Sequence, residues 1–339
     1  MKPNHWFLMS IFFIAVAVAA AGAAEIPEGY DPSLRPGYGS GPTPVQVGVF
    51  LIDLVNIDDV RQAFTASLYF EVGYKDPRLA DPAAPGLRIF SLGEIWWPDL
   101  GLVNRRSLQI LFPHQLRVDR EGNVTYRQRV YGDFSAPLNL RAFPYDTQQL
   151  PIEVASNTLG PEELNLSANL EETGRMDSLS QAGWSVLTEG LEVRPHRIEK
   201  HGREQLVFSL TASRKSPFYR WSILLPLCFI VLMAWCVFWI DPQFVNPQIS
   251  LSTASTFALI AFRFSLRSML PKVDYMTYLD EFVLACTVLV FLALGQAILT
   301  ARLSKTGQGE LAGRIDVWSR VVYLVAFGLL VATTLRLNF

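Results

Sequence analysis

The spacing of apolar positions changes near residue 217. Before it, short runs alternate apolar and polar side chains, which predicts strands with one buried face. These runs cover residues 45–50, 64–74, 108–118, 124–134, 184–193 and 205–212. Glu121-Gly122-Asn123 predicts a hairpin turn between two of them. Many short strands without a long helical pattern predict an antiparallel, immunoglobulin-like β-sandwich.

After residue 217 the apolar stretches become long and continuous. They predict helices at about 218–240, 247–269, 278–303 and 315–337. Each is close to the ~20 residues that cross the hydrocarbon core of a membrane. Residues 218–339 are therefore expected to form a four-helix transmembrane bundle.

Residues 1–24 have the pattern of a secretory signal peptide, with Lys2 before an apolar core and small residues at its end. We therefore expect residues 25–217 to form an exported domain. The chain has three cysteines, all beyond residue 217, so no disulfide is expected in that domain. The loop between the third and fourth helices is basic, which places it in the cytoplasm.

The second apolar stretch is unlike the other three. It carries five hydroxyl side chains, at Ser250, Ser252, Thr253, Ser255 and Thr256. It also carries Arg263 and Arg267, and such residues suit a helix that faces water inside a membrane. A pore is the leading hypothesis. The alternative is a membrane-anchored binding receptor whose hydroxyls hold a solid bundle together.

Short motifs resemble those of the pentameric ligand-gated ion channels, the Cys-loop receptor superfamily, in its bacterial form. They are Asp76-Pro77-Arg78-Leu79, Trp96-Trp97-Pro98-Asp99, Phe143-Pro144-Tyr145-Asp146-Thr147-Gln148, Arg214 with Pro217 to Pro226, and Leu270-Pro271-Lys272. They occur in the family's order and span nearly the whole mature chain. The resemblance implies a homopentamer in the bacterial inner membrane, with the sandwich in the periplasm.

Two departures from the family pattern stand out. Ala136 and Leu150 occupy the positions of the two cysteines found in animal receptors, as in bacterial members. In the expected ligand pocket Tyr69 stays aromatic, whereas Val103 and Asn157 replace aromatic residues. The nearby loop 194–203 is basic. An anionic ligand, a proton or no small ligand is therefore expected rather than a quaternary amine. The basic pocket residues are Arg194, His196 and Arg203.

The resemblance also implies which face of the second helix lines the pore. That face comprises Asn246, Ser250, Ala254, Phe257, Ala261, Phe264 and Ser268. Phe257 and Phe264 would form apolar constrictions, with Phe257 as the main gate. Spacing alone leaves a second register open. It would line the lumen with Thr253, Thr256, Ile260, Arg263 and Arg267.

Other residues are expected to connect the sandwich to the helices. Phe143 and Pro144 would touch the linker from Pro271 to Tyr278, and Arg214 would pair with Asp146 and with Asp58 or Asp59. At the inner mouth Asp241 is the only charge, which favours cations over anions.

Several classes of function are not indicated. The usual hydrolase, metalloprotease and nucleotide-binding motifs are missing, so an enzyme is not expected, nor is a metal site or a cofactor. The net charge of −2 gives no footprint for nucleic acid. The expected partners are copies of the same chain, permeant inorganic ions, membrane lipids and an unidentified small-molecule or proton agonist.

Overall fold

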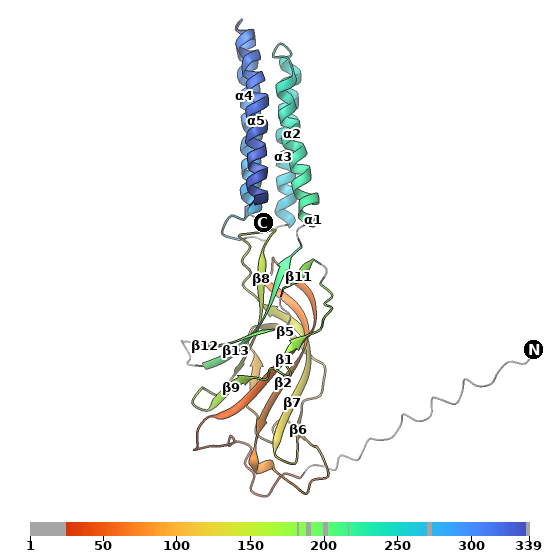
Figure 1. Cartoon of the computed structure of the whole chain (residues 1–339), viewed down its shortest axis with the longest axis vertical. Helices are drawn as coiled ribbons and strands as arrows, with labels where there is room; N and C mark the ends of the chain where they lie inside the picture. Colours follow the sequence, from red (N-terminus) through yellow and green to blue (C-terminus); the bar gives the residue numbers. More distant parts are fainter. Residues whose placement is uncertain are drawn as a thin grey trace, which may run out of the picture.

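The computed structural model describes residues 25–181, 183–187, 191–198, 203–215, 217–269 and 273–336. A β-sandwich lies at one end of an elongated molecule, and a bundle of long helices lies at the other (Figure 1). The predicted signal peptide, residues 1–24, lies outside the described residues.

The larger sheet of the sandwich has eight strands. Its order is β10-β1-β2-β7-β6-β3, with β5 also paired to β7 and β9 to β1. Neighbouring strands are antiparallel except that β9 and β10 run parallel to β1. The strands are β1 (Thr43–Asp58), β2 (Ala63–Lys75), β3 (Arg88–Ser91), β5 (Arg105–Ile110), β6 (Gln115–Val118), β7 (Asn123–Ser135), β9 (Leu164–Ala168) and β10 (Gly174–Arg175).

The smaller sheet has five strands in the order β11-β13-β8-β4, with β12 also paired to β13. They are β4 (Leu100–Leu102), β8 (Thr147–Ser156), β11 (Trp184–Val186), β12 (Glu192–Ile198) and β13 (Arg203–Arg214). Alternate side chains of both sheets fill one apolar core, which includes Phe64, Phe134 and Phe208. The predicted sandwich is confirmed, and burial of apolar surface holds it together without a disulfide.

The predicted strand at 108–118 is wrong in one respect, because it divides into β5 and β6 on either side of Pro113. The run at 184–193 also divides, into β11 and the start of β12. Strand β8 was not predicted, and its central Pro151 is atypical of a strand. The hairpin turn between β6 and β7 is confirmed. Its Gly122 has φ +81, and a Cβ there would meet the Asp76 carbonyl oxygen.

Four helical segments are long and apolar enough to cross a membrane. The first consists of α1 (Pro217–Tyr219), the π-helical turn η2 (Arg220–Leu224), α2 (Leu225–Cys236) and the 3₁₀ turn η3 (Val237–Trp239). The others are α3 (Val245–Met269), α4 (Tyr278–Lys305) and α5 (Gly309–Arg336). The π-helical turn lies just before Pro226, whose missing N–H interrupts regular helix bonding. Helix α5 begins earlier than the predicted residue 315.

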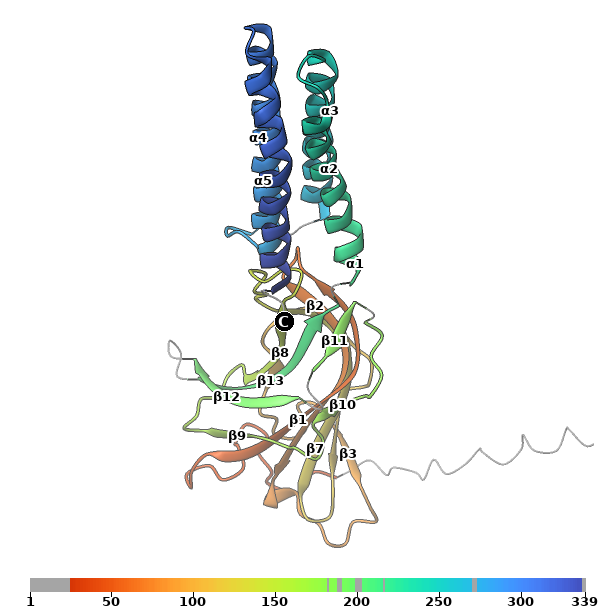
Figure 2. The same ribbon diagram turned by 45° about the horizontal axis from the view of Figure 1, so that its top comes forward.

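The helices pack as two adjacent pairs, α2 with α3 and α4 with α5, and α4 also packs against α3 (Figures 1 and 2). The turns between α2 and α3 and between α4 and α5 both lie at the end of the bundle that is distant from the sandwich. The opposite end of the bundle meets the sandwich, so residues at the junction can contact both parts of the chain.

Candidate functional site

Helix α3 has one face packed against the bundle and one face that the chain leaves open. Six of the predicted pore residues are on the open face: Asn246, Ser250, Ala254, Phe257, Ala261 and Phe264. Phe257 and Phe264 are 65% and 67% exposed, which is unusual for phenylalanine in a packed bundle. None of the six is charged. The side chain of Ser268, the seventh predicted position, lies outside the described ones.

Most hydroxyl groups of α3 do not lie on its open face, contrary to the prediction. Ser252, Ser255 and Thr256 are buried against the bundle. Ser255 donates to the carbonyl oxygen of Leu251 and Thr256 to that of Ser252, both at 2.9 Å. Such bonds within a helix satisfy hydroxyls in an apolar setting. Most of the hydroxyl-rich pattern therefore belongs to the packed face, and of the five only Ser250 is exposed.

Arg214 lies at the end of β13, where the sandwich meets the first helical segment. Its guanidinium forms two-pronged hydrogen bonds with Asp59, at 2.7 and 2.8 Å. It also bonds both carboxylate oxygens of Asp146, at 2.8 and 3.1 Å. The Arg214 side chain is only 4% exposed, so this is a buried cluster of one cation and two anions. Gln148 donates a further hydrogen bond to Asp146.

Aromatic rings surround the same guanidinium. Its carbon lies 4.2 Å from the ring centre of Trp184, 4.8 Å from that of Phe143 and 5.8 Å from that of Tyr219. Burial alone would lower the pKa of Arg214, but its bonds to Asp59 and Asp146 outweigh burial and raise the pKa above its ordinary value. Because Tyr219 belongs to α1, the Arg214 cluster spans the junction.

Of the two predicted aspartates, the structure brings Asp59 rather than Asp58 to Arg214. Asp58 instead closes the turn between β1 and β2, because its carboxylate accepts hydrogen bonds from the backbone of Val60 and Arg61. Short polar side chains commonly satisfy turn backbone in this way. The prediction left the choice open, and local turn geometry decides it.

The segment between β7 and β8 contacts the linker that precedes α4. The Leu140 backbone N–H donates to the Tyr275 hydroxyl at 2.9 Å, and the Tyr278 N–H donates to the Arg141 carbonyl oxygen at 2.9 Å. Arg141 lies over the Tyr275 ring at 5.4 Å. The predicted contact residues Phe143 and Pro144 belong to the same β7–β8 segment and are buried, and Phe143 packs against Tyr219. Pro271 lies outside the described residues.

The residues predicted for a ligand pocket divide between the two sheets. Tyr69, on β2, packs against Phe112 and Arg129, at 6.1 and 6.0 Å, in the larger sheet. Val103, Asn157, Arg194 and His196 belong to the smaller sheet or its adjoining loops, and the side chain of Arg203 is not described. Asn157 donates to Asp99, and Arg194 pairs with Glu192. Within one chain, Tyr69 is therefore separated from the other predicted pocket residues.

Sequence reasoning missed Trp184, Gln148, Leu140, Arg141 and Tyr275. The hydrogen bonds of Leu140 and Arg141 use backbone groups, which leave no signal in the sequence. Within the described residues, no three His, Cys, Asp or Glu side chains are placed to hold a metal ion.

Both parts of the chain match families of known proteins. Residues 23–216 match the neurotransmitter-gated ion-channel ligand binding domain, and residues 223–310 match the neurotransmitter-gated ion-channel transmembrane region. A proton-gated ion channel from Gloeobacter violaceus is 28% identical over 84% of this chain and 80% of its own length.

Two animal relatives are more distant. The gamma-aminobutyric acid receptor subunit beta-4 of Gallus gallus is 24% identical over 79% of this chain. The glycine receptor subunit beta of Rattus norvegicus is 25% identical over 78% of it. The chain spans 57% and 56% of the lengths of these two animal subunits. The relatives are channels and receptor subunits rather than enzymes. The chain belongs to the neurotransmitter-gated ion channel family, the Cys-loop receptor superfamily.

Proposed function

We propose that five copies of this chain form a ligand- or proton-gated ion channel whose pore is lined by α3. The observation that carries this proposal is the uncharged open stripe from Asn246 to Phe264, opposite a packed face on the same helix. A helix shared between a bundle and a central pore needs two such faces. In the other register Thr256 would face the lumen, but it is buried and bonded within α3.

The two exposed phenylalanines on this stripe are proposed as the gate. Five Phe257 side chains would make an apolar ring that water leaves when the pore narrows, and five Phe264 side chains would make a second ring. Asn246 and Ser250 offer polar groups at the inner mouth, and Ser268 extends the proposed lining outward. Small residues at Ala254 and Ala261 leave room between the rings.

The junction is proposed to carry the gating signal from the sandwich to α3. The Arg214 cluster joins the residue after β1, the residue before β8 and the end of β13 to Tyr219 at the start of the helices. Leu140 and Arg141 contact the linker between α3 and α4. Movement of the sandwich would therefore reach the start of the first helical segment and the linker that follows α3. We assign this coupling role to Asp59, Phe143, Pro144, Asp146, Arg214 and Pro271, and no longer to Asp58.

For the agonist, we propose protons or a small anion. The bacterial relative is described as proton-gated, and the pocket candidates of this chain include Arg194, His196 and Arg203. Because Tyr69 and these residues lie in different sheets of one chain, we propose that the pocket forms between neighbouring copies, with Tyr69 from one and Arg194 and His196 from the other. The sandwich is proposed to face the periplasm and the helices to cross the inner membrane.

The test is electrical. Purified protein in planar bilayers is expected to carry discrete single-channel currents when the sandwich side is acidified or supplied with small carboxylates. Cysteines introduced singly along the stripe should react with water-soluble thiol reagents, whereas a cysteine at buried Leu259 should not. Lack of current, together with unreactive stripe positions under every condition, would favour a receptor without a pore.

A further inference from the structure

Asp316 on α5 is a carboxylate buried within the helical bundle. It is 1% exposed and belongs to the N-terminal part of α5, which begins at the end of the bundle that is distant from the sandwich. An ionisable side chain in such a place is costly, and it is commonly retained because it serves a function. Neither the proposed gate on α3 nor the proposed coupling residues at the junction include Asp316.

Two amides hold this carboxylate. Gln296 of α4 donates to Asp316 Oδ1, and Gln248 of α3 donates to Oδ2 at 3.4 Å. The Gln248 amide nitrogen also donates to the Ile240 carbonyl oxygen at 3.2 Å. If the Gln248 amide were rotated by half a turn, its oxygen would face the Ile240 carbonyl oxygen and the Asp316 carboxylate, which are both acceptors. The carboxylate therefore helps to fix the orientation of this amide. Asp316 thus ties α5 to both α4 and α3.

A second charged residue of α5 holds the segment just before α3. Arg320 donates to the Phe238 carbonyl oxygen at 2.9 Å, and its guanidinium lies 4.4 Å from the ring centre of Trp239. The Trp235 indole N–H donates to the Arg320 carbonyl oxygen at 2.9 Å. Helix α5 therefore contacts both sides of the 241–244 connection. Arg320 bonds to η3, just before it, and Asp316 bonds to the first turn of α3, just after it.

Gln248 lies between Asn246 and Ser250, the first two residues of the proposed pore stripe, but points the opposite way. It is fully buried, whereas they are exposed. A shift or rotation of α3 at Gln248 must therefore move the inner mouth. Of the two contacts from α5, the one through Asp316 reaches α3 itself.

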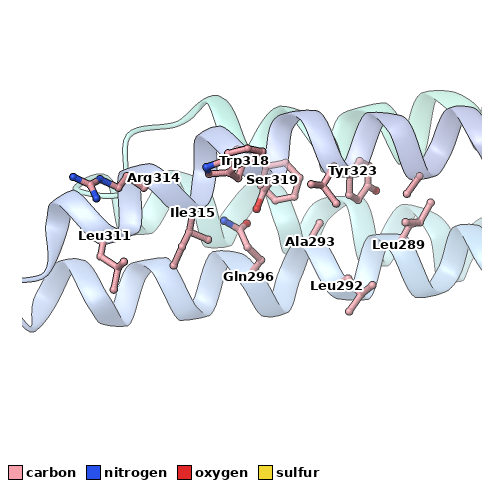
Figure 3. A pocket seen from close by; sticks show the side chains of 13 residues that line it. Leu289, Leu292, Ala293, Gln296, Leu311, Arg314, Ile315, Trp318, Ser319 and Tyr323 are labelled. Carbon is pink, nitrogen blue, oxygen red and sulfur yellow. The ribbon is translucent and has the colours of Figure 1, made fainter.

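We propose that Asp316 is a positioning residue for the inner mouth of the pore, acting through Gln248. This inference rests on the proposed function, because it takes α3 as the pore helix. It makes α5, which packs chiefly against α4, a determinant of pore geometry. Gln296, the third member, also lines an open groove of about 530 Å³ between α4 and α5, beside Ser319 (Figure 3).

The experiment uses full-length protein in liposomes, with the three native cysteines replaced by alanine. Asn246→Cys reports on the inner mouth and Ala261→Cys on the outer half of the stripe, through their rates of reaction with a charged thiol reagent. Loss of a hydrogen bond to a charged group shifts an equilibrium by about tenfold. Asp316→Leu and Gln248→Leu should each change the rate at position 246 by that factor and leave position 261 unchanged.

Three comparisons separate positioning from loss of structure. The double variant Asp316→Leu/Gln248→Leu should change the rate by less than the sum of the two single effects, because both single variants remove the shared Gln248–Asp316 link. Asp316→Asn keeps an acceptor and a donor for the amides and should retain most of the native rate. Thr300→Val removes another buried polar group, one that bonds only within α4 in the described contacts, and should change nothing.

Unchanged rates at position 246 in pentameric Asp316→Leu and Gln248→Leu would overturn the proposal, as would additive effects in the double variant. If Asp316→Leu fails to assemble, Gln248→Leu and Asp316→Asn decide the question alone. Single-channel recording on the same samples keeps the two proposals apart. One outcome is a protein that carries no current while the thiol reaction rate at position 246 still changes in the Asp316 variants. That result would reject the proposed channel function but support the proposed link through Asp316.

Discussion

At the scale of single residues, Arg214 combines more interactions than any other side chain at the junction. Two carboxylates neutralise it, and three aromatic rings exclude water from it. Removing one member of a buried ionic cluster costs about 3–5 kcal/mol, because the remaining charges stay buried without partners. The carboxylates of Asp59 and Asp146 would then face each other with no cation between them.

We therefore expect Arg214→Ala to lose nearly all pentameric protein or all response to a stimulus, as measured by size-exclusion chromatography and by current in bilayers. Arg214→Lys should fail almost as severely, because an ammonium group cannot form both two-pronged contacts at once. Arg61→Ala is the control, since its side chain is 73% exposed and its 4.0 Å pair with Asp58 is weak. Normal assembly and current in Arg214→Ala would exclude the coupling role.

Phe257 offers the simplest test of the gate. Replacing it with alanine removes the apolar ring, so water and ions should persist in the resting pore. We expect Phe257→Ala to raise the resting current severalfold, measured without any stimulus and normalised to the amount of inserted protein. Leu259→Ala is the matched control. It removes a buried side chain two positions away on the packed face and should lower stability without raising resting current.

The sequence predicted these residues unevenly, for physical reasons. Arg214 and Asp146 were found because their motifs are distinctive, but the choice of Asp59 over Asp58 depends on a turn that spacing cannot resolve. The hydroxyls of α3 were misleading, because serine and threonine suit both a wet surface and a packed helix in which they bond to their own backbone. Burial separates these two cases, and burial requires the neighbouring helices.

At the scale of elements, the contact between the β7–β8 segment and the linker before α4 is small. Its described contacts are one hydrogen bond to the Tyr275 hydroxyl, one backbone bond from Tyr278 and the packing of Arg141 over the Tyr275 ring. A neutral hydrogen bond contributes about 1 kcal/mol, which corresponds to about a fivefold change in an equilibrium. If this contact couples the two domains, its loss should alter gating without altering assembly.

We therefore expect Tyr275→Phe to shift the proton concentration for half-activation by about fivefold in bilayer recordings, since one neutral hydrogen bond is lost. Tyr278→Phe should leave it unchanged, because Tyr278 contributes its backbone N–H to the contact. The two variants differ from the native protein by the same single oxygen atom. Equal shifts in both would mean that the Tyr275 hydroxyl has no particular part in coupling.

Strands and helices were easier to predict than their boundaries. Alternation identified β1, β2, β7 and β13, each of which has one face in the core. It failed for β8, whose Pro151 is atypical of a strand, and it joined β5 to β6 across Pro113. The π-helical turn η2 could not be read from apolar spacing, which is blind to the N–H that Pro226 lacks shortly after it.

At the scale of the whole molecule, ion selectivity depends on charges that five copies would gather around one axis. The described stripe on α3 carries none, so the nearest charges at its inner end decide the local potential. Asp241 is exposed on the connection between η3 and α3, and a ring of five would concentrate cations at the inner mouth. Arg263 is half-buried to one side of the stripe, where it would repel cations less than a residue facing the lumen.

We expect the reversal potential in a salt gradient to follow the cation, and Asp241→Asn to move it toward zero and to reduce inward-to-outward conductance asymmetry. Glu310→Gln is the matched control, because it removes an acidic charge from the same end of the bundle but on α5. Its effect should be small, since exposed charges on a distant helix are screened within about 10 Å. A reversal potential that follows chloride in the native protein would reverse the assignment, and the open face of α3 would then need a basic ring that its described side chains do not supply.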